Sequence, residues 1–198
     1  SPVMTASFVM AFLAAVALFW AIGAYNRLVR LRAEVVKAFS VLDNVLSVQP
    51  ALIQASIPMP GMPTTGAEQP PLPWDRLGAA GEQYARALAN ARAQPLDPHA
   101  IATLSAAQDV LDGVWQSAAL QASDNVPAAL PDGLQMRLAR LADQAVVPGQ
   151  LFDASVQTYN AAIRQFPALL LALVWGFKPA ATLNAQRTDG SPMLNVEP

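Results

Sequence analysis

The feature that constrains this chain most is its opening stretch, residues 1–26, which contains no charged side chain. Residues 3–25 are built mostly from Ala, Val, Phe, Leu, Met and Ile. At a rise of about 1.5 Å per residue, a helix of this length reaches roughly 34 Å, enough to cross the ~30 Å hydrocarbon layer of a bilayer. The pattern therefore predicts a transmembrane anchor over residues 1–26.

A cleaved signal peptide is the alternative, because Ala21 and Gly23 could serve as small residues at a cleavage site. The stretch lacks the basic segment that begins such peptides, and its apolar part is longer than theirs, so a retained anchor is favoured. We expect aromatic side chains in the lipid or, near the end of the span, at the headgroup layer. These aromatic residues are Phe8, Phe12, Phe19, Trp20 and Tyr25.

Basic side chains follow the span, and none precedes it. They are Arg27, Arg30, Arg32 and Lys37. The positive-inside tendency places the amino-terminus outside and the larger carboxy-terminal part in the cytoplasm, although a domain on this stem could still be exported. We expect a single crossing of a bacterial inner (cytoplasmic) membrane.

The composition removes several classes of function. The chain has no cysteine and one histidine, His99, so it lacks the usual ligands for thiolate or histidine metal sites. Lys and Arg number 12 against 14 Asp and Glu, which gives no general attraction to nucleic acid. We expect no cofactor and no nucleic acid. The expected partners are membrane lipids and either other subunits of a membrane complex or further copies of the chain, because only 13% of the residues are charged.

Helical periodicity continues beyond the span, and a heptad seam runs through Leu28, Leu31, Val35, Ala38, Leu42 and Val45, widened by Val29, Val36, Phe39 and Leu46. We expect one rod that ends near Gln49, because Pro50 lacks a backbone donor. Residues 50–73 hold seven of the 17 prolines and are predicted to form a connector. A docking strip for a partner's aromatic groove is the alternative.

Further amphipathic helices are predicted over residues 74–94 and 98–121 and from Leu134 to Leu170, the last with kinks or short interruptions at Pro148 and Pro167. The expected fold class is all-α: an elongated antiparallel three- or four-helix bundle over residues 27–177, continuous with the transmembrane helix. Residues 178–198 are expected to form a flexible tail. The uncharged residues 168–177 belong either to the bundle core or to a segment at the membrane surface, with Trp175 and Lys178 in the headgroup layer.

Two stretches resemble the LemA family of membrane-anchored helical proteins. Residues 25–53 begin with Tyr25 and Asn26 and contain Leu-Val, Ala-Phe-Ser and Asp motifs similar to that family's opening pattern. Residues 151–180 are similar to its closing pattern, through Tyr159, Asn160, Phe166, Pro167, Gly176 and Phe177. The resemblance implies a helical architecture and membrane attachment, and it implies little about mechanism.

The remaining polar residues leave alternatives. Asn26 and Asn160 either bridge helices near the membrane or face solvent, since a buried amide needs partners. Asp109 and Asp112 are three residues apart, which is more typical of a solvated helix face than of a metal or acid–base pair. We predict a single-pass, membrane-anchored scaffold or accessory subunit that is not an enzyme. The alternatives are a membrane-associated hydrolase using carboxylates and a membrane-remodelling protein.

Overall fold

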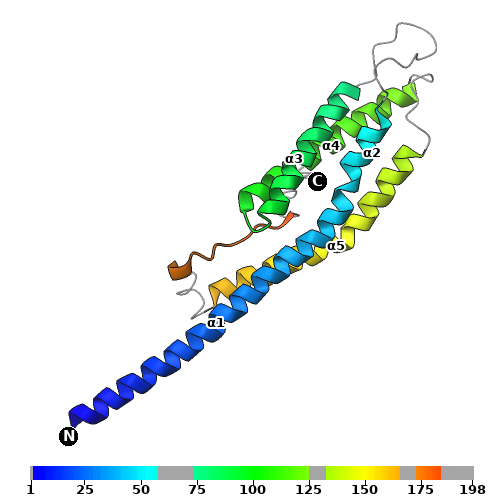
Figure 1. The fold of residues 1–198 in the computed structure, drawn as a ribbon. Coiled ribbons are helices and arrows are strands. Elements are labelled where there is room, and N and C mark those ends of the chain that lie inside the picture. The colour runs from blue at the N-terminus through cyan, green and yellow to red at the C-terminus, as the bar shows by residue number, and fades with distance from the viewer. Residues whose placement is uncertain (1, 58–73, 125–132, 166–172, 184–198) are drawn as a thin grey trace, which may run out of the picture.

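The computed structural model describes residues 2–57, 74–124, 133–165 and 173–183, and in these ranges it contains helices and no strand. The helices are α1 (Pro2–Leu46), α2 (Val48–Ser56), α3 (Trp74–Ala93), α4 (Pro98–Asp124) and α5 (Leu134–Arg164). Figure 1 shows an elongated bundle from which the first half of α1 projects as a single rod. The predicted all-α class and the continuity of the first helix with the bundle are confirmed.

Helix α1 has a free part and a packed part, and the boundary lies near Leu28. Its 45 residues correspond to a length of about 68 Å. From Leu28 onward the predicted seam is buried against α5, and Val35 and Leu42 are almost fully enclosed. Val29 and Val36, which were expected to widen the apolar face, are exposed instead. The packed face of α1 is therefore narrower than the sequence pattern indicated.

The predicted end of the first rod at Gln49 is wrong, because the helical path continues as α2 to Ser56 after a single turn residue, Ser47. Pro50 is the third residue of α2, in the first turn, where the backbone N–H groups have no acceptor within the same helix, so the missing donor costs little. The connector expected from residue 50 therefore starts later, and residues 58–73 lie outside the described ranges.

Helix α5 runs antiparallel to α1. Arg27 Nη1 donates to Gln165 Oε1 at 3.0 Å near one end, and the rings of Phe39 and Phe152 meet edge to face at 5.4 Å further along. The helix continues through Pro148, so the short interruption that was one of the two expectations there does not occur. In Figure 1 both rods change direction at about the level where α1 passes into α2.

Helix α5 ends at Arg164, and Gln165 is extended, so the expected run to Leu170 does not continue as part of this helix. Proline disfavours helix in the residue before it, which agrees with an end upstream of Pro167. Phe166 and Pro167 themselves lie outside the described residues, so the kink expected at Pro167 stays a prediction.

Helices α3 and α4 form an antiparallel hairpin close to the predicted bounds. Asp97 accepts a hydrogen bond from the backbone N–H of His99 at 3.0 Å, the N-cap that the Asp-Pro pair predicts. Helix α3 also packs against α1 and α2. A side chain at Gly81 would meet Ile53 at 3.6 Å, which shows how closely α2 approaches α3.

The bundle is not closed on all sides. Helix α4 packs on α3, and α5 packs on α1 and α2, but over the residues placed in the structure no Cα atom of α4 comes within 8 Å of one in α5. The core nevertheless includes Leu104 and Leu111 of α4 together with Phe152 and Val156 of α5. An opening between α4 and α5 is lined by residues of both helices and of α1 and α2.

Candidate functional site

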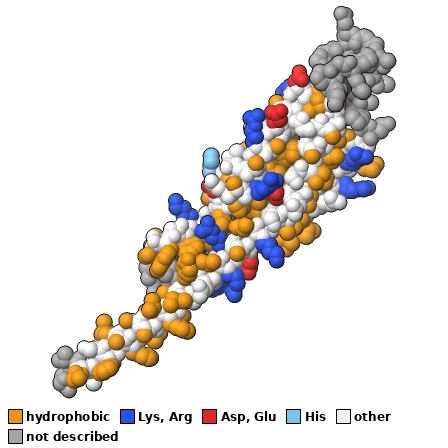
Figure 2. All heavy atoms as spheres, in the orientation of Figure 1, with side chains coloured by type: hydrophobic (Ala, Val, Ile, Leu, Met, Phe, Trp, Pro, Cys, Tyr) orange, Lys and Arg blue, Asp and Glu red, His pale blue; other side chains and the backbone are white. Residues whose placement is uncertain are grey.

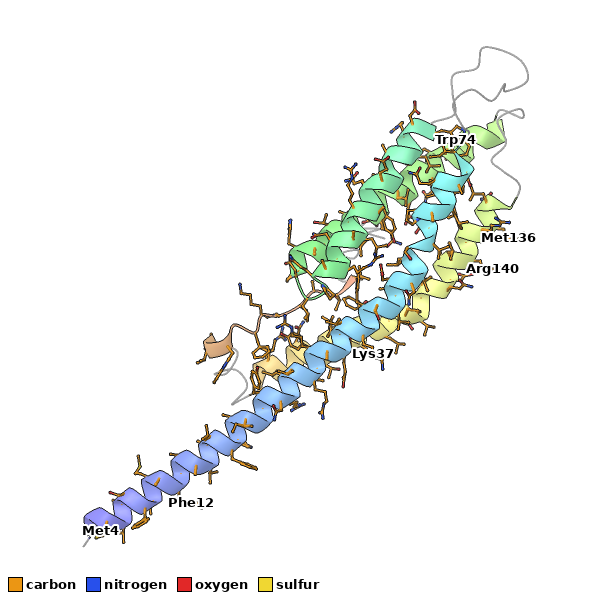
Figure 3. The ribbon with its side chains drawn as sticks, viewed as in Figure 1. Met4, Phe12, Lys37, Trp74, Met136 and Arg140 are labelled. Atoms are coloured by element: carbon orange, nitrogen blue, oxygen red, sulfur yellow. The ribbon has the colours of Figure 1, made fainter. Side chains whose placement is uncertain are left out.

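The free part of α1 presents apolar side chains outward along its length. Phe8, Phe12 and Phe19 have 73%, 69% and 82% of their surface exposed, and Trp20 has 60% exposed. Figure 2 shows hydrophobic side chains covering this rod, with charged side chains appearing only where the bundle begins, and Figure 3 shows Met4 and Phe12 projecting from it. Among the described helices, one is long and apolar enough to cross a membrane, and its apolar window is unburied.

An aromatic cluster lies where the free rod meets the bundle, and it consists of Tyr25, Trp175 and Phe177. The Tyr25 ring is 6.0 Å from that of Trp175 and 5.9 Å from that of Phe177, with tilted and edge-on orientations. Such geometries are the favourable ones for aromatic pairs. The chain after α5 is thereby brought back to the base of the rod, as the antiparallel fold requires.

Residues 173–175 face outward beside this cluster. Leu173, Val174 and Trp175 are 77%, 74% and 58% exposed, so the bundle-core alternative is wrong for these three residues. Gly176 follows with φ of 72°, a left-handed conformation that glycine adopts without strain at the end of a helical turn. The exposed Lys178 comes two residues later, and Arg27 and Arg30 are exposed on α1 nearby. Apolar, aromatic and basic side chains thus lie together where the free part of α1 joins the bundle.

Two α5 side chains hold the chain that follows the cluster. Asn160 Nδ2 donates to the Ala180 carbonyl at 2.8 Å, and the Ala180 N–H donates to Asn160 Oδ1 at 2.9 Å. The Leu183 N–H donates to Asp153 Oδ1 at 2.9 Å. Neither alternative for Asn160 was correct, because its amide binds the returning chain; Asn26 faces solvent. Tyr159 is buried beside Asn160, and burial raises its pKa while Arg32 opposes the rise.

The opening between α4 and α5 is a groove of about 600 Å³. Its floor includes Leu42 and Leu46 of α1, and its walls include Trp115 of α4 and Leu138 of α5. Leu183 lines it as well, so the segment held by Asn160 and Asp153 leads into it. The lining is largely apolar, with glutamine side chains and Asp112 among it.

A charged pair joins α1 to α3, and a buried tyrosine lies on α3. Arg92 of α3 donates through Nε and Nη2 to both carboxylate oxygens of Asp43 at 2.7 and 2.9 Å, and this bonding raises the pKa of Arg92. The Tyr84 hydroxyl is buried and, within the described part of the chain, has no hydrogen-bond partner. Burial raises its pKa, and the charges of Asp112 and Asp43 add to the rise.

The structure brings Tyr25, Arg27, Arg30, Trp175 and Lys178, which were predicted as interface residues, to one level. Phe177, predicted only as part of the family-like motif, lies there as well. Sequence reasoning missed Asp43, Arg92 and Asp153. A signal was present for Asp43, which sits between Phe39 and Leu46 at helical spacing within a buried stripe. Asp109 is exposed and Asp112 half-buried at the groove; across the described ranges, no group of three His, Cys, Asp or Glu side chains is placed to hold a metal.

Comparison with known proteins gives one match. The model of the LemA family matches residues 79–197, more than half of the chain, and this range contains the second of the two resembling stretches. No curated protein and no solved structure matches the chain.

Proposed function

The chain belongs to the LemA family, and on that premise we propose that it is a single-pass, membrane-anchored helical scaffold or accessory subunit of a membrane protein assembly, without catalytic activity. The observation that carries the proposal is the free part of α1, whose apolar side chains are exposed along the rod. Exposed apolar surface costs roughly 25 cal/mol per Å² in water, and a bilayer of ~30 Å removes that cost for a helix of this length.

The aromatic cluster supports the placement of the membrane boundary. Tyr25, Trp175 and the neighbouring Lys178 combine apolar bodies with polar ends, the chemistry that the headgroup layer favours. Arg27 and Arg30 add positive charge there, which attracts anionic lipids. The outward-facing residues 173–175 would then touch the lipid surface beside the anchor. The same basic residues favour an orientation in a bacterial inner membrane that places the bundle in the cytoplasm and the amino-terminus outside.

A role in an assembly is supported by apolar side chains on the outer faces of the packed helices. Val36 on α1 and Val147 and Leu151 on α5 are 45%, 62% and 58% exposed. Apolar side chains on outer faces suit contact with other subunits or further copies. The groove favours packing over acid–base catalysis, because apolar and amide groups predominate in its lining and neither kind transfers protons readily.

The experiment is native mass spectrometry of the full chain extracted from membranes in mild detergent. When membranes are washed with alkaline carbonate, we expect the protein to stay in the membrane fraction. In native mass spectrometry, we expect the extracted complex to have the mass of the chain with companion subunits or of a homo-oligomer. Leu151→Glu should weaken that association, whereas Gln157→Glu, which adds the same charge at another exposed α5 position, should not. Release by carbonate would refute the anchor, and a monomer without companions would refute the scaffold role.

A further inference from the structure

Five exposed basic side chains lie where the free part of α1 joins the bundle. We call them the basic collar: Arg27, Arg30, Arg32, Arg164 and Lys178. On the premise of the membrane anchor proposed above, we propose that the basic collar binds the headgroups of anionic phospholipids. The outward-facing residues 173–175 enter the same lipid surface beside it.

Contacts between distant parts of the chain bring the basic collar together. Arg27 Nη1 donates to Gln165 Oε1 at 3.0 Å, which places the preceding residue, Arg164, at the same level of the bundle. Lys178 comes directly after the aromatic cluster, which packs against α1 at this level. Three separate segments therefore supply positive charge to one narrow band.

The three arginines of α1 point to different sides of the rod. A helix turns by about 100° per residue, so Arg27 and Arg32 flank the buried seam of Leu28 and Leu31 on opposite sides, and Arg30 faces outward. They lie within about 8 Å along the helix axis, since five residues at ~1.5 Å separate the first from the last. Figure 2 shows Lys and Arg side chains gathered where the uncharged rod ends.

No carboxylate neutralises this charge in the part of the chain that the structure places there. The described segments at this level, residues 2–33, 154–165 and 173–183, contain no Asp or Glu. Glu34 comes next along α1, and over the described ranges no ion pair joins it to the basic collar. The collar holds five of the 12 Lys and Arg, which leaves seven elsewhere against 14 Asp and Glu. A chain of net negative charge thus presents a positive band that is complementary to an anionic surface.

The apolar side chains at the same level favour lipid as the source of that anionic surface. Leu173, Val174 and Trp175 are largely exposed, and Lys178 follows them closely in the chain. At a bilayer surface, aliphatic side chains enter the acyl boundary, a Trp ring lies among the headgroups, and a Lys stem extends to the phosphates. A nucleic-acid backbone would neutralise the basic collar and leave these apolar side chains in water.

The composition of the basic collar suits phosphate in particular. Four of its five members are arginines, and the planar guanidinium fork matches two phosphate oxygens at once. The Arg27 guanidinium uses one N–H for Gln165, and this bond fixes its position while its other donors stay available to a headgroup.

The test is native mass spectrometry of the full chain in mild detergent with equal amounts of phosphatidylglycerol and phosphatidylcholine that carry the same acyl chains. Both lipids contain a phosphate, but the choline group cancels the charge of the second. A Lys or Arg near an anionic surface strengthens binding about fivefold. We expect the chain to retain phosphatidylglycerol over phosphatidylcholine by at least that factor, and equal retention of the two lipids would overturn the proposal.

Two double variants test whether the preference belongs to the basic collar. Arg30→Gln with Lys178→Gln removes two collar charges, and we expect the preference for phosphatidylglycerol to fall at least about fivefold. Arg137→Gln with Arg140→Gln removes the same charge from exposed positions near the other end of α5, and it should keep the preference of the unaltered chain. The same loss in both variants would mean that total charge, and not the basic collar, sets the preference, and it would overturn the site.

A measurement in vesicles of the two lipids separates a failure of this site from a failure of the anchor. Trp20→Phe leaves Trp175 as the tryptophan beside the lipid, and bromine on the acyl chains of one lipid at a time quenches its fluorescence. We expect stronger quenching by brominated phosphatidylglycerol, with a difference that shrinks at high salt. Equal quenching by both lipids, or none by either, would overturn the site while a carbonate-resistant chain keeps the anchor. Release of the chain by alkaline carbonate would overturn the anchor and the site together.

Discussion

Asp43 shows how a single residue joins helix α1 to helix α3. Its carboxylate lies in the apolar stripe of α1 and receives two hydrogen bonds from Arg92 of α3. Removal of Arg92 leaves the largely buried Asp43 carboxylate without these bonds, whereas Arg92 itself is exposed. We predict that Asp43→Asn lowers the thermal unfolding midpoint measured by circular dichroism, while Asp143→Asn, on the exposed side of α5, leaves it unchanged. An equal midpoint for both variants would show that the pair contributes nothing.

Tyr84 is a residue that the fold buries at a cost. Its side chain is fully enclosed, and its hydroxyl finds no partner among the described residues. A buried polar group without a hydrogen bond costs on the order of 1–3 kcal/mol. We predict that Tyr84→Phe raises the free energy of unfolding by about 1 kcal/mol in chemical denaturation. A loss of stability would reveal a hydrogen bond that the hydroxyl makes in solution.

The same tyrosine predicts how stability depends on pH. Burial, with Asp112 and Asp43, raises the pKa of Tyr84 above its ordinary value near 10. The unfolded chain therefore loses this proton first, and the stability present below about pH 10 falls as the pH rises further. We predict a steeper fall for the wild type than for Tyr84→Phe in denaturation curves above about pH 9. Tyr159 remains in both proteins, so some decline persists in the variant; parallel curves would contradict the account.

At the scale of elements, the chain after the aromatic cluster depends on the Asn160 amide. Asn160→Ala removes a donor and an acceptor to Ala180. We predict much faster hydrogen exchange at the Ala180 amide in this variant, and an intermediate rate in Asn160→Asp, which keeps the acceptor and loses the donor. Unchanged exchange in Asn160→Ala would show that Ala180 is held by packing alone.

The helices show which part of the structure was predictable. The periodicity of apolar residues in the sequence predicted α3, α4 and the packed half of α1, because a buried helix face repeats every three or four residues. The prolines were less informative, since Pro50 is tolerated in a first turn while α5 stops three residues before Pro167. The contacts that define the site join Asp43 to Arg92 and Asn160 to Ala180, residues far apart in sequence. No local sequence pattern specifies which distant residues form such pairs, so these contacts could be identified only from the three-dimensional structure.

At the scale of the whole molecule, α1 supplies both a helix apolar enough to span a membrane and part of the structural core. The same helix carries the exposed apolar side chains of the rod and, after Leu28, the buried seam against α5. The aromatic cluster marks the change between these environments, and the returning chain meets α1 there. No loop separates the exposed apolar rod from the bundle, because one helix forms both.

The most direct test of this account is cysteine accessibility in intact membranes, with a membrane-impermeant maleimide. Phe12→Cys lies in the free rod, and Gln157→Cys lies on the exposed face of the bundle. In vesicles with the bundle side outward, the account predicts labelling of Gln157→Cys and protection of Phe12→Cys until detergent is added. Equal labelling of both before detergent would show that the rod lies in water, and it would contradict the membrane anchor.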